Sequence, residues 1–434
     1  MQAFVSDIFL CLEGNYMILL KGNIIHSPSL TNVETIENGY LLLDDEGTIV
    51  KILNNKPDNF NGTIIDYGNK LIMQSFADMH LHAPQYPNVG MGMDLPLLDW
   101  LKTYTFKTEA YFSNLEYARR VYKKLAKDLI DYGTTHVVMF SSMHTDSTII
   151  LMEELEKAGV TGYVGKVNMD RNGGENLQES TIESMEETLR WLDLSKRFKY
   201  IKPIITPRFT PSCTNELMEW LGNLANEKDL YVQSHLSESK SEIEWVKSLH
   251  PDCDYYWETY NKYGLWKDHT IMAHCVYSDK NEREAIKKNN VVVAHCADSN
   301  INLCSGICPV REMLNEGVWV TLGSDIAAGA SMAMYNMITL SIKASKVRCF
   351  QSEGKNKFLS VQEAYYLGTT SGHKYFGNHE GFAVGDKLHA IVVDDSTFVE
   401  SPMPLTLNER LERALYNMNK ENIVSVWSEG RKIK

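Results

Sequence analysis

The sequence lacks a long apolar segment, a basic block and a regular cysteine framework. No apolar run approaches the roughly 18 residues that span a bilayer, so no membrane-embedded segment is expected. The 434 residues carry a formal net charge of −13, and no basic block offsets it, which argues against nucleic acid as a partner. The eight cysteines show no disulfide pattern, and Cys304 and Cys308 lack the second pair of a zinc ribbon. We therefore expect reduced thiols.

The first residues also lack a basic stretch. They include Asp7 and Glu13, so no secretory signal peptide is expected. Together these absences predict a cytoplasmic protein with no membrane partner. The hydrophobic content of 44% and charged content of 23% are typical of a globular chain, long enough for a barrel and a smaller domain.

Strand-like apolar runs alternate with amphipathic, helix-length segments between residues 71 and 374. The expected strands cover residues 71–80, 136–140, 162–167, 201–206, 230–235, 270–275, 291–295 and 318–323. Because each parallel crossover needs a covering helix, this alternation predicts an α/β fold, a (β/α)8 TIM-like barrel. Residues 1–70 and 375–434 are rich in short β-runs and turn residues. We expect the two chain ends to pair into one small β-sandwich.

Two histidines, His80 and His82, close the apolar segment 71–82. Alternate residues of a strand point to one side, so both imidazoles would project from the same face. Further metal-capable side chains end later strand-like runs: His235, His274 and Asp325. In a closed barrel the C-terminal ends of the strands share one face. Imidazoles and a carboxylate meeting there suit zinc or iron(II), with an open position for a water molecule whose pKa the metal lowers.

Glu238, three residues past His235, is a candidate proton shuttle beside such a metal. Each group has an ordinary alternative: a strand-end histidine is often structural, Asp325 could cap a helix, and Glu238 could be a solvated acid. The position of all five metal-capable groups at strand ends of one pattern favours the metal site. Other histidines keep the structural interpretation: His136, His144, His295 and His373.

The strand ends and their neighbouring segments resemble the amidohydrolase superfamily and, within it, the guanine deaminase family. The segments that carry the resemblance are residues 78–86, 94–101, 165–170, 207–209, 233–238, 272–274 and 323–329. The His-x-His pair marks only the superfamily, whereas the Leu-Pro-Leu-Leu-Asp-Trp-Leu and Pro-Arg-Phe stretches are more specific. The resemblance covers essentially the whole chain, and it implies a homodimer.

The resemblance implies a role for each matching residue. The ligands of one divalent metal ion, zinc by default and iron(II) as the alternative, would be His80, His82, His235 and Asp325. His274 would lie beside the metal as a hydrogen-bond partner of the substrate, and Glu238 would shuttle protons. The purine would be held by Gln85, Arg208 and Phe209. The segment 294–300 departs from the family, because Ala297 and Asp298 stand where Pro and Asn are expected.

Elementary chemistry supports a purine substrate. The O6 and N7 atoms of guanine are two acceptors spaced for a guanidinium such as that of Arg208. Phe209 could stack on the ring, and Trp100 could wall the pocket. The expected reaction is hydrolytic deamination of guanine to xanthine and ammonia in purine catabolism or salvage. The alternatives are a related enzyme that deaminates or dechlorinates another nitrogen heterocycle, or a barrel that has lost its chemistry.

Overall fold

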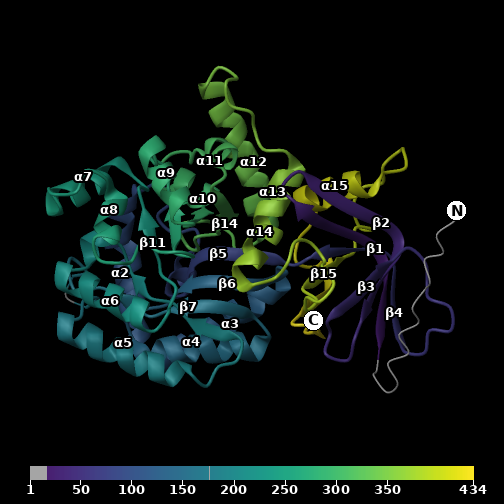
Figure 1. Ribbon diagram of the computed structural model, residues 1–434, viewed down its shortest axis with the longest axis horizontal. Helices are drawn as coiled ribbons and strands as arrows, with labels where there is room; N and C mark the ends of the chain where they lie inside the picture. The colour runs from purple at the N-terminus through teal and green to yellow at the C-terminus, as the bar shows by residue number, and fades with distance from the viewer. Residues whose placement is uncertain (1–16, 175) are drawn as a thin grey trace, which may run out of the picture.

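The computed structural model describes residues 17–174 and 176–434 (Figure 1). The predicted absence of a signal peptide concerns residues 1–16, which lie outside the described residues. Figure 1 shows two parts side by side: parallel strands surrounded by helices, and a sheet that contains strands from both ends of the chain.

The second part is one seven-stranded sheet with the order β17-β16-β15-β4-β1-β2-β3. Its strands are β1 (Ile18–Ser29), β2 (Asn32–Leu43), β3 (Ile49–Leu53), β4 (Thr63–Gln74), β15 (Ala390–Val393), β16 (Ile423–Ser428) and β17 (Arg431–Lys432). Strand β15 pairs antiparallel with β4, with Ile391 opposite Met73, and so joins the two chain ends. The predicted meeting of the chain ends is therefore observed in one sheet, whereas a two-layered sandwich stays a prediction.

Among the described residues, the first part contains only parallel strand pairs. These strands are β5 (Phe76–His82), β6 (Thr134–Phe140), β7 (Thr161–Gly165), β8 (Val167–Asn168), β9 (Ile201–Pro203), β10 (Thr206–Pro207), β11 (Gln233–Leu236), β12 (Ile271–His274), β13 (Val292–His295) and β14 (Trp319–Leu322). They form the orders β5-β6-β7-β9, β8-β10 and β11-β12-β13-β14. The predicted alternation of strands and helices is present, and each predicted strand coincides with an observed one to within a few residues, apart from the first.

Backbone contacts connect these parallel sheets. A parallel bridge joins Ile205, which lies between β9 and β10, to Val232, the residue before β11. At the other side, the Asp325 N–H donates to the carbonyl oxygen of His80 at 2.8 Å, and the His82 N–H donates to that of Ile326 at 3.0 Å. The segment that follows β14 is thereby held against β5, and the two ends of the strand series meet where the predicted site residues lie.

The predicted strand 71–80 is in fact parts of two strands. Residues 71–74 end β4, where they pair with β1 and β15, and β5 begins only at Phe76. The whole run is buried, so its hydrophobicity is uniform on both sides of Ser75. A continuous apolar run does not record where its hydrogen-bond partners change, and this explains the difference.

Helices lie between the parallel strands and beyond them. They are α1 (Leu97–Trp100), α2 (Phe106–Ala110), α3 (Leu115–Asp131), α4 (Thr145–Ala158), α5 (Thr181–Ser195), α6 (Asn215–Glu227), α7 (Lys240–Leu249), α8 (Tyr256–Asn261), α9 (Lys280–Lys288), α10 (Ala297–Asn302), α11 (Val310–Glu316), α12 (Met334–Gln351), α13 (Val361–Gly368), α14 (Thr370–His373) and α15 (Leu407–Asn417). Short 3-10 or π turns are η1 (Ala83–Asn88), η2 (Leu101–Thr105), η3 (Tyr111–Ser113), η4 (Thr210–Ser212) and η5 (Lys374–Phe376). Within the described ranges, no helix is both long and apolar enough to cross a membrane.

Local chemistry explains several helix starts. Helix α5 begins with a reciprocal capping box, in which the Ser180 hydroxyl accepts the Glu183 N–H and the Glu183 carboxylate accepts the Ser180 N–H. Helix α3 is capped by the preceding residue, Asn114, whose side chain accepts the Tyr117 N–H. The inward faces of these outer helices pack against the strands and form one large apolar core, which leaves the strand ends to carry polar groups.

Candidate active site

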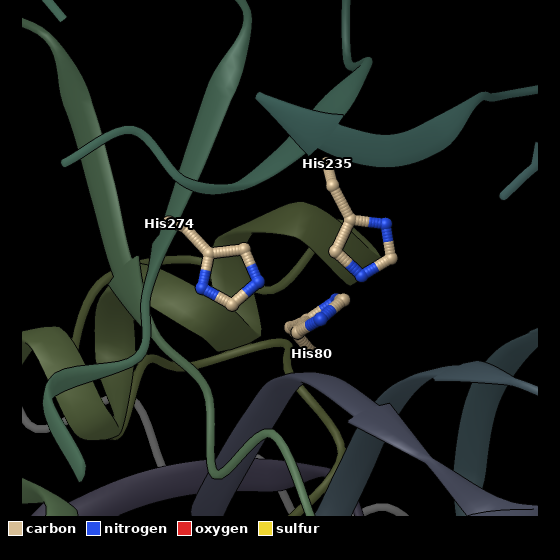
Figure 2. Close-up of side chains that lie close together, drawn as sticks. All are labelled: His80, His235 and His274. Carbon is tan, nitrogen blue, oxygen red and sulfur yellow. The ribbon is translucent and has the colours of Figure 1, made fainter. Parts of the chain in front are cut away.

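A cluster of histidines lies at the C-terminal ends of the parallel strands. Figure 2 shows the rings of His80, His235 and His274 turned toward one another. One ligand atom from each lies within 4.8 Å of the other two, and the same is true of the group His80, His82 and Asp325. The structure therefore brings together all five metal-capable residues that the sequence predicted.

The hydrogen bonds of the cluster favour a metal ion. The Nδ1–H of His235 donates to the carbonyl oxygen of Arg208 at 2.6 Å, which leaves the Nε2 lone pair of His235 free. That nitrogen lies 3.1 Å from Nε2 of His82. Both ring nitrogens of His80 are buried and have no hydrogen-bond partner among the described residues. Buried lone pairs that converge in this way fit a shared cation.

The electrostatics of the cluster agree with this fit. Burial lowers the pKa of His80 and holds those of His82 and His235 well below their ordinary value, so these rings are neutral near pH 7. Burial opposes ionisation of Asp325, but its contacts with His80 and His274 outweigh this and lower its pKa to about 2. Its Oδ1 lies 3.3 Å from Nε2 of His80 and 3.5 Å from Nε2 of His82. The cluster thus combines neutral imidazoles with a carboxylate anion.

Asp78 helps to place Asp325, a function that the sequence analysis missed. Its carboxylate accepts the Ser324 N–H at 2.9 Å and the Ser324 hydroxyl at 2.5 Å. Burial raises the pKa of Asp78 to about 7. Asp325 itself has a φ of 47°, an uncommon conformation for a residue other than glycine, and these contacts hold it there. The spacing of two between Asp78 and His80 was the available signal, because both lie on one face of β5.

Glu238 lies next to the cluster, as expected. Its Oε2 is 3.6 Å from Nε2 of His274, and its Oε1 accepts the Ser305 hydroxyl at 3.1 Å. Burial raises the pKa of Glu238 to about 7, and nearby Glu242 adds to this, although His274 opposes it. A carboxyl group with this pKa can both accept and donate a proton at neutral pH.

Asn300 orients His274. The Nδ1–H of His274 donates to Oδ1 of Asn300 at 2.8 Å, so Nε2 faces the carboxylates of Glu238 and Asp325. Burial lowers the pKa of His274, but the two carboxylates outweigh burial and raise it. Asn300 lies in the segment that departs from the family, yet the sequence analysis gave it no role.

One pocket connects the cluster to the predicted substrate residues. Its lining contains Gln85, Trp100, Arg208, Phe209, Glu238 and His274, together with His82, His235 and Asp325. The segment between β5 and α3 supplies Gln85 and Trp100, and the Trp100 Nε1–H donates to the carbonyl oxygen of Met91 at 2.9 Å. Phe209 packs edge-on against Trp245, with ring centroids 5.8 Å apart.

The structure adds one buried acid to this pocket wall. Glu109, in α2, forms an ion pair with Arg208 and accepts a hydrogen bond from Gln85. It lies 24 residues from Gln85 and 99 from Arg208, and no spacing in the sequence connects the three. Only the folded chain shows that two of the predicted purine-binding residues, Gln85 and Arg208, share a partner.

The departure from the family has a local effect. Ala297 and Asp298 begin α10, and the Asp298 carboxylate accepts the Ala330 N–H at 2.7 Å. This contact ties α10 to the segment that follows Asp325. Neither Ala297 nor Asp298 belongs to the metal-capable groups.

Comparison with known proteins agrees with this geometry. The sequence profile of the amidohydrolase family matches residues 71–433, and the chain belongs to this family. Membership implies a TIM-barrel fold and a divalent metal ion, for which the histidine and aspartate cluster supplies candidate ligands.

Individual relatives give a more specific comparison than the family profile. Guanine deaminase of Dictyostelium discoideum is 38% identical over 451 aligned residues, which cover 98% of this chain and 100% of that protein. Guanine deaminase of Mus musculus is 34% identical, with 96% of both chains covered. The crystal structure of guanine deaminase from C. acetobutylicum, with guanine bound in its active site, has a TM-score of 0.93 and 43% identity, and the match covers 96% of this chain and 100% of that one.

Proposed function

We propose that this protein is a guanine deaminase, which hydrolyses guanine to xanthine and ammonia. The observation that carries the proposal is a single pocket that combines a histidine and aspartate cluster, an acid–base carboxyl group and the paired Arg208 and Gln85. Relatives that share about a third or more of the sequence over nearly its full length carry that name. We also propose a role in purine catabolism or salvage.

The ligands of one divalent metal ion would be His80, His82, His235 and Asp325. Neutral imidazoles and a carboxylate suit zinc, with iron(II) as the alternative. When bound, the metal would lower the pKa of a water molecule and so supply hydroxide at neutral pH.

The residues of the chain would move the protons. Glu238, with a pKa of about 7, would accept a proton from the attacking water and pass it to a ring nitrogen of guanine. Glu238 would next take the remaining proton of the attacking water from the new hydroxyl group on C2 and deliver it to the amino group, so that ammonia leaves and the C2 oxygen becomes a carbonyl of xanthine; Asp325 could share the first proton transfer. His274, oriented by Asn300 through Nδ1–H, would be protonated on both ring nitrogens and would donate a hydrogen bond from Nε2 to the oxygen on the tetrahedral carbon.

The purine would lie between the metal-capable cluster and the outer pocket wall. Arg208 would donate to acceptor atoms of the base, Gln85 would accept from a ring N–H, and Phe209 would stack on the ring. Trp100, which is buried, would close the pocket on its other side.

The remaining proposals concern organisation. We propose a (β/α)8 barrel over residues 71–374, flanked by residues 1–70 and 375–434 as the two parts of a small β-sandwich. The parallel sheets and the contacts that join β5 to the end of β14 support the barrel. We further propose a cytoplasmic homodimer that acts on a small molecule and binds neither nucleic acid nor membranes.

The test is ammonia release by purified protein of known metal content. Guanine is the expected substrate, and adenine, cytosine and a chlorotriazine are run in parallel. Ammonia from guanine alone supports the proposal. A fully metallated protein that ignores guanine but releases ammonia or chloride from another ring would identify the alternative, a related hydrolase of a different heterocycle.

A further inference from the structure

Glu109 connects the two residues that face the purine from the outer wall of the pocket. It is buried, with 1% of its surface exposed. Its Oε1 accepts the Gln85 Nε2–H at 2.8 Å and an Arg208 Nη2–H at 3.0 Å, and its Oε2 accepts an Nη1–H of Arg208. A carboxylate in this position accepts hydrogen bonds and donates none, so it constrains what each neighbour can present to a ligand.

The first constraint acts on the amide of Gln85. Because Glu109 only accepts, the amide nitrogen of Gln85 must face it, and the amide oxygen must face elsewhere. That oxygen is buried and has no hydrogen-bond partner among the described residues, although Gln85 lines the pocket. A buried acceptor without a partner costs free energy unless a ligand N–H reaches it. Gln85 therefore presents an acceptor to the pocket.

The second constraint acts on the guanidinium of Arg208. Its two terminal nitrogens point at Glu109, and the described residues offer no other hydrogen-bond acceptor to its side chain. The guanidinium carbon lies 5.1 Å from the centre of the Phe106 ring, which covers one face. The Nε–H edge stays available for a ligand. Arg208 therefore presents donors next to the acceptor of Gln85.

We propose that Glu109 is a positioning residue that sets the donor and acceptor polarity of this wall and thereby selects guanine over adenine. The inference rests on the proposed function. In guanine the acceptor O6 stands beside the donor N1–H, which matches donors from Arg208 and an acceptor from Gln85. In adenine the 6-amino donor stands beside the acceptor N1, and the same wall meets both with the wrong partner.

Equilibrium binding to a slow variant provides the test. In a Glu238→Gln background, guanine and adenine affinities are measured by calorimetry with and without Glu109→Gln. The amide has nearly the shape of the acid, but it can donate to Gln85 and lets that side chain turn over. We expect the Kd for guanine to rise about 100-fold, with adenine little changed, so that discrimination between the two falls by a similar factor.

Kinetics of the single variant separate positioning from chemistry. Glu109→Gln in the otherwise native enzyme should raise KM for guanine about as much as Kd and change kcat by less than about threefold. In an Arg208→Gln background, the addition of Glu109→Gln should raise KM for guanine further by less than about tenfold, because Glu109 acts through Arg208 and Gln85.

A matched control is available far from the pocket. Asp395 accepts two hydrogen bonds from Arg410, at 2.7 and 2.9 Å, and both side chains are largely buried. Asp395→Asn removes a comparable ion pair, so it should lower the melting temperature without a change in Kd or KM. If Glu109→Gln behaves like this control, Glu109 is only structural and the inference is wrong.

The outcomes for the two proposals are distinguishable. A native enzyme that releases ammonia from guanine, with Kd and KM unaffected by Glu109→Gln, overturns the role of Glu109 and leaves the proposed function intact. A protein that binds guanine with the expected dependence on Glu109 but does not deaminate it overturns the proposed function alone. A metallated protein that neither binds nor deaminates guanine overturns both.

Discussion

The parallel strands carry a histidine cluster at each end, and the two clusters differ in what their nitrogens meet. At the C-terminal ends, the Nε2 atoms of His82 and His235 face each other and both nitrogens of His80 lack partners within the described structure. Near the N-terminal ends, where the strands meet the seven-stranded sheet, the His136 ring packs at a tilt against those of His373 and His389, with centroid distances of 4.5 and 4.2 Å.

The second cluster is tied to neighbouring polar groups. Nδ1 of His136 lies 3.1 Å from the Thr135 hydroxyl, and Nε2 of His389 lies 3.4 Å from a carboxylate oxygen of Glu429. His136, His389 and Glu429 bring ligand atoms within 4.8 Å of one another, as the first cluster does. The pocket that holds the proposed substrate, however, adjoins only the first cluster. Proximity of ligand atoms is therefore a weaker indicator of chemistry than unpaired nitrogens beside a pocket.

The largest expected effect is a difference in metal content and turnover between variants of the two histidine clusters. His235→Ala removes a proposed metal ligand of the first cluster, so we expect loss of most of the bound metal and of all measurable turnover. His389→Ala, at the other end, should retain both. Elemental analysis and ammonia release measure the two quantities. Full metal occupancy in His235→Ala, or metal loss in His389→Ala, would reverse the comparison.

Glu238→Gln should have the next largest effect. It removes the proposed proton shuttle but leaves the proposed metal ligands, so kcat should fall by about a thousandfold at unchanged metal content. Glu429→Gln, a carboxylate-to-amide change in the second cluster, is the control, and its kcat should stay within about twofold. Near-normal turnover by fully metallated Glu238→Gln would rule out the shuttle.

A smaller effect is expected from Arg208→Lys. Lysine keeps the charge but loses the planar fork that pairs with Glu109 and that we propose contacts the purine. We expect KM for guanine to rise about 30-fold with a smaller change in kcat, as measured in steady-state assays. An unchanged KM would show that charge alone suffices and would move purine recognition to other residues.

The smallest effect concerns stability and pH at the second cluster. Burial lowers the pKa of His373 from 6.5 to about 3, and His389 adds to this. The unfolded chain therefore takes up a proton below pH 6.5 that the folded chain does not, and stability is lost as pH falls from 6.5 toward 3. At pH 5 the loss from this group is about 2 kcal/mol relative to pH 7.

His373→Gln tests this linkage. The variant should be less stable than the native protein at pH 7, but its stability should fall less steeply between pH 7 and pH 5. Urea unfolding at several pH values gives both slopes. Parallel slopes for the two proteins would mean that His373 takes no part in the pH dependence.

Local patterns predicted the parts of the molecule that local geometry decides. Because strand residues alternate, the spacing of His80 and His82 was enough to place both rings on one side. The apolar runs that end at His235 and His274 were recognisable as strands, and the structure has β11 and β12 there. The position of Asp325 after β14 follows in the same way.

Partners distant in sequence were not predictable. Asn300 orients His274 from 26 residues away, and Glu109 reaches Arg208 across 99. The change of strand at Ser75 was also missed, because burial on both sides makes the apolar run uniform. None of these features leaves a periodic signal, since each depends on which segments the fold brings together.

The amino-acid sequence on its own determined the kinds of groups available and their places along each strand: imidazoles, a carboxylate at the last strand end and a nearby acid. Whether those groups meet, and which nitrogens stay unpaired, depended on the packing of the strands around one another. The reason is physical. The spacing of residues along a strand sets the direction in which each side chain points. The convergence of the metal-capable side chains, and the pairing of Glu109 with Gln85 and Arg208, depend instead on distances between segments that are far apart in the sequence.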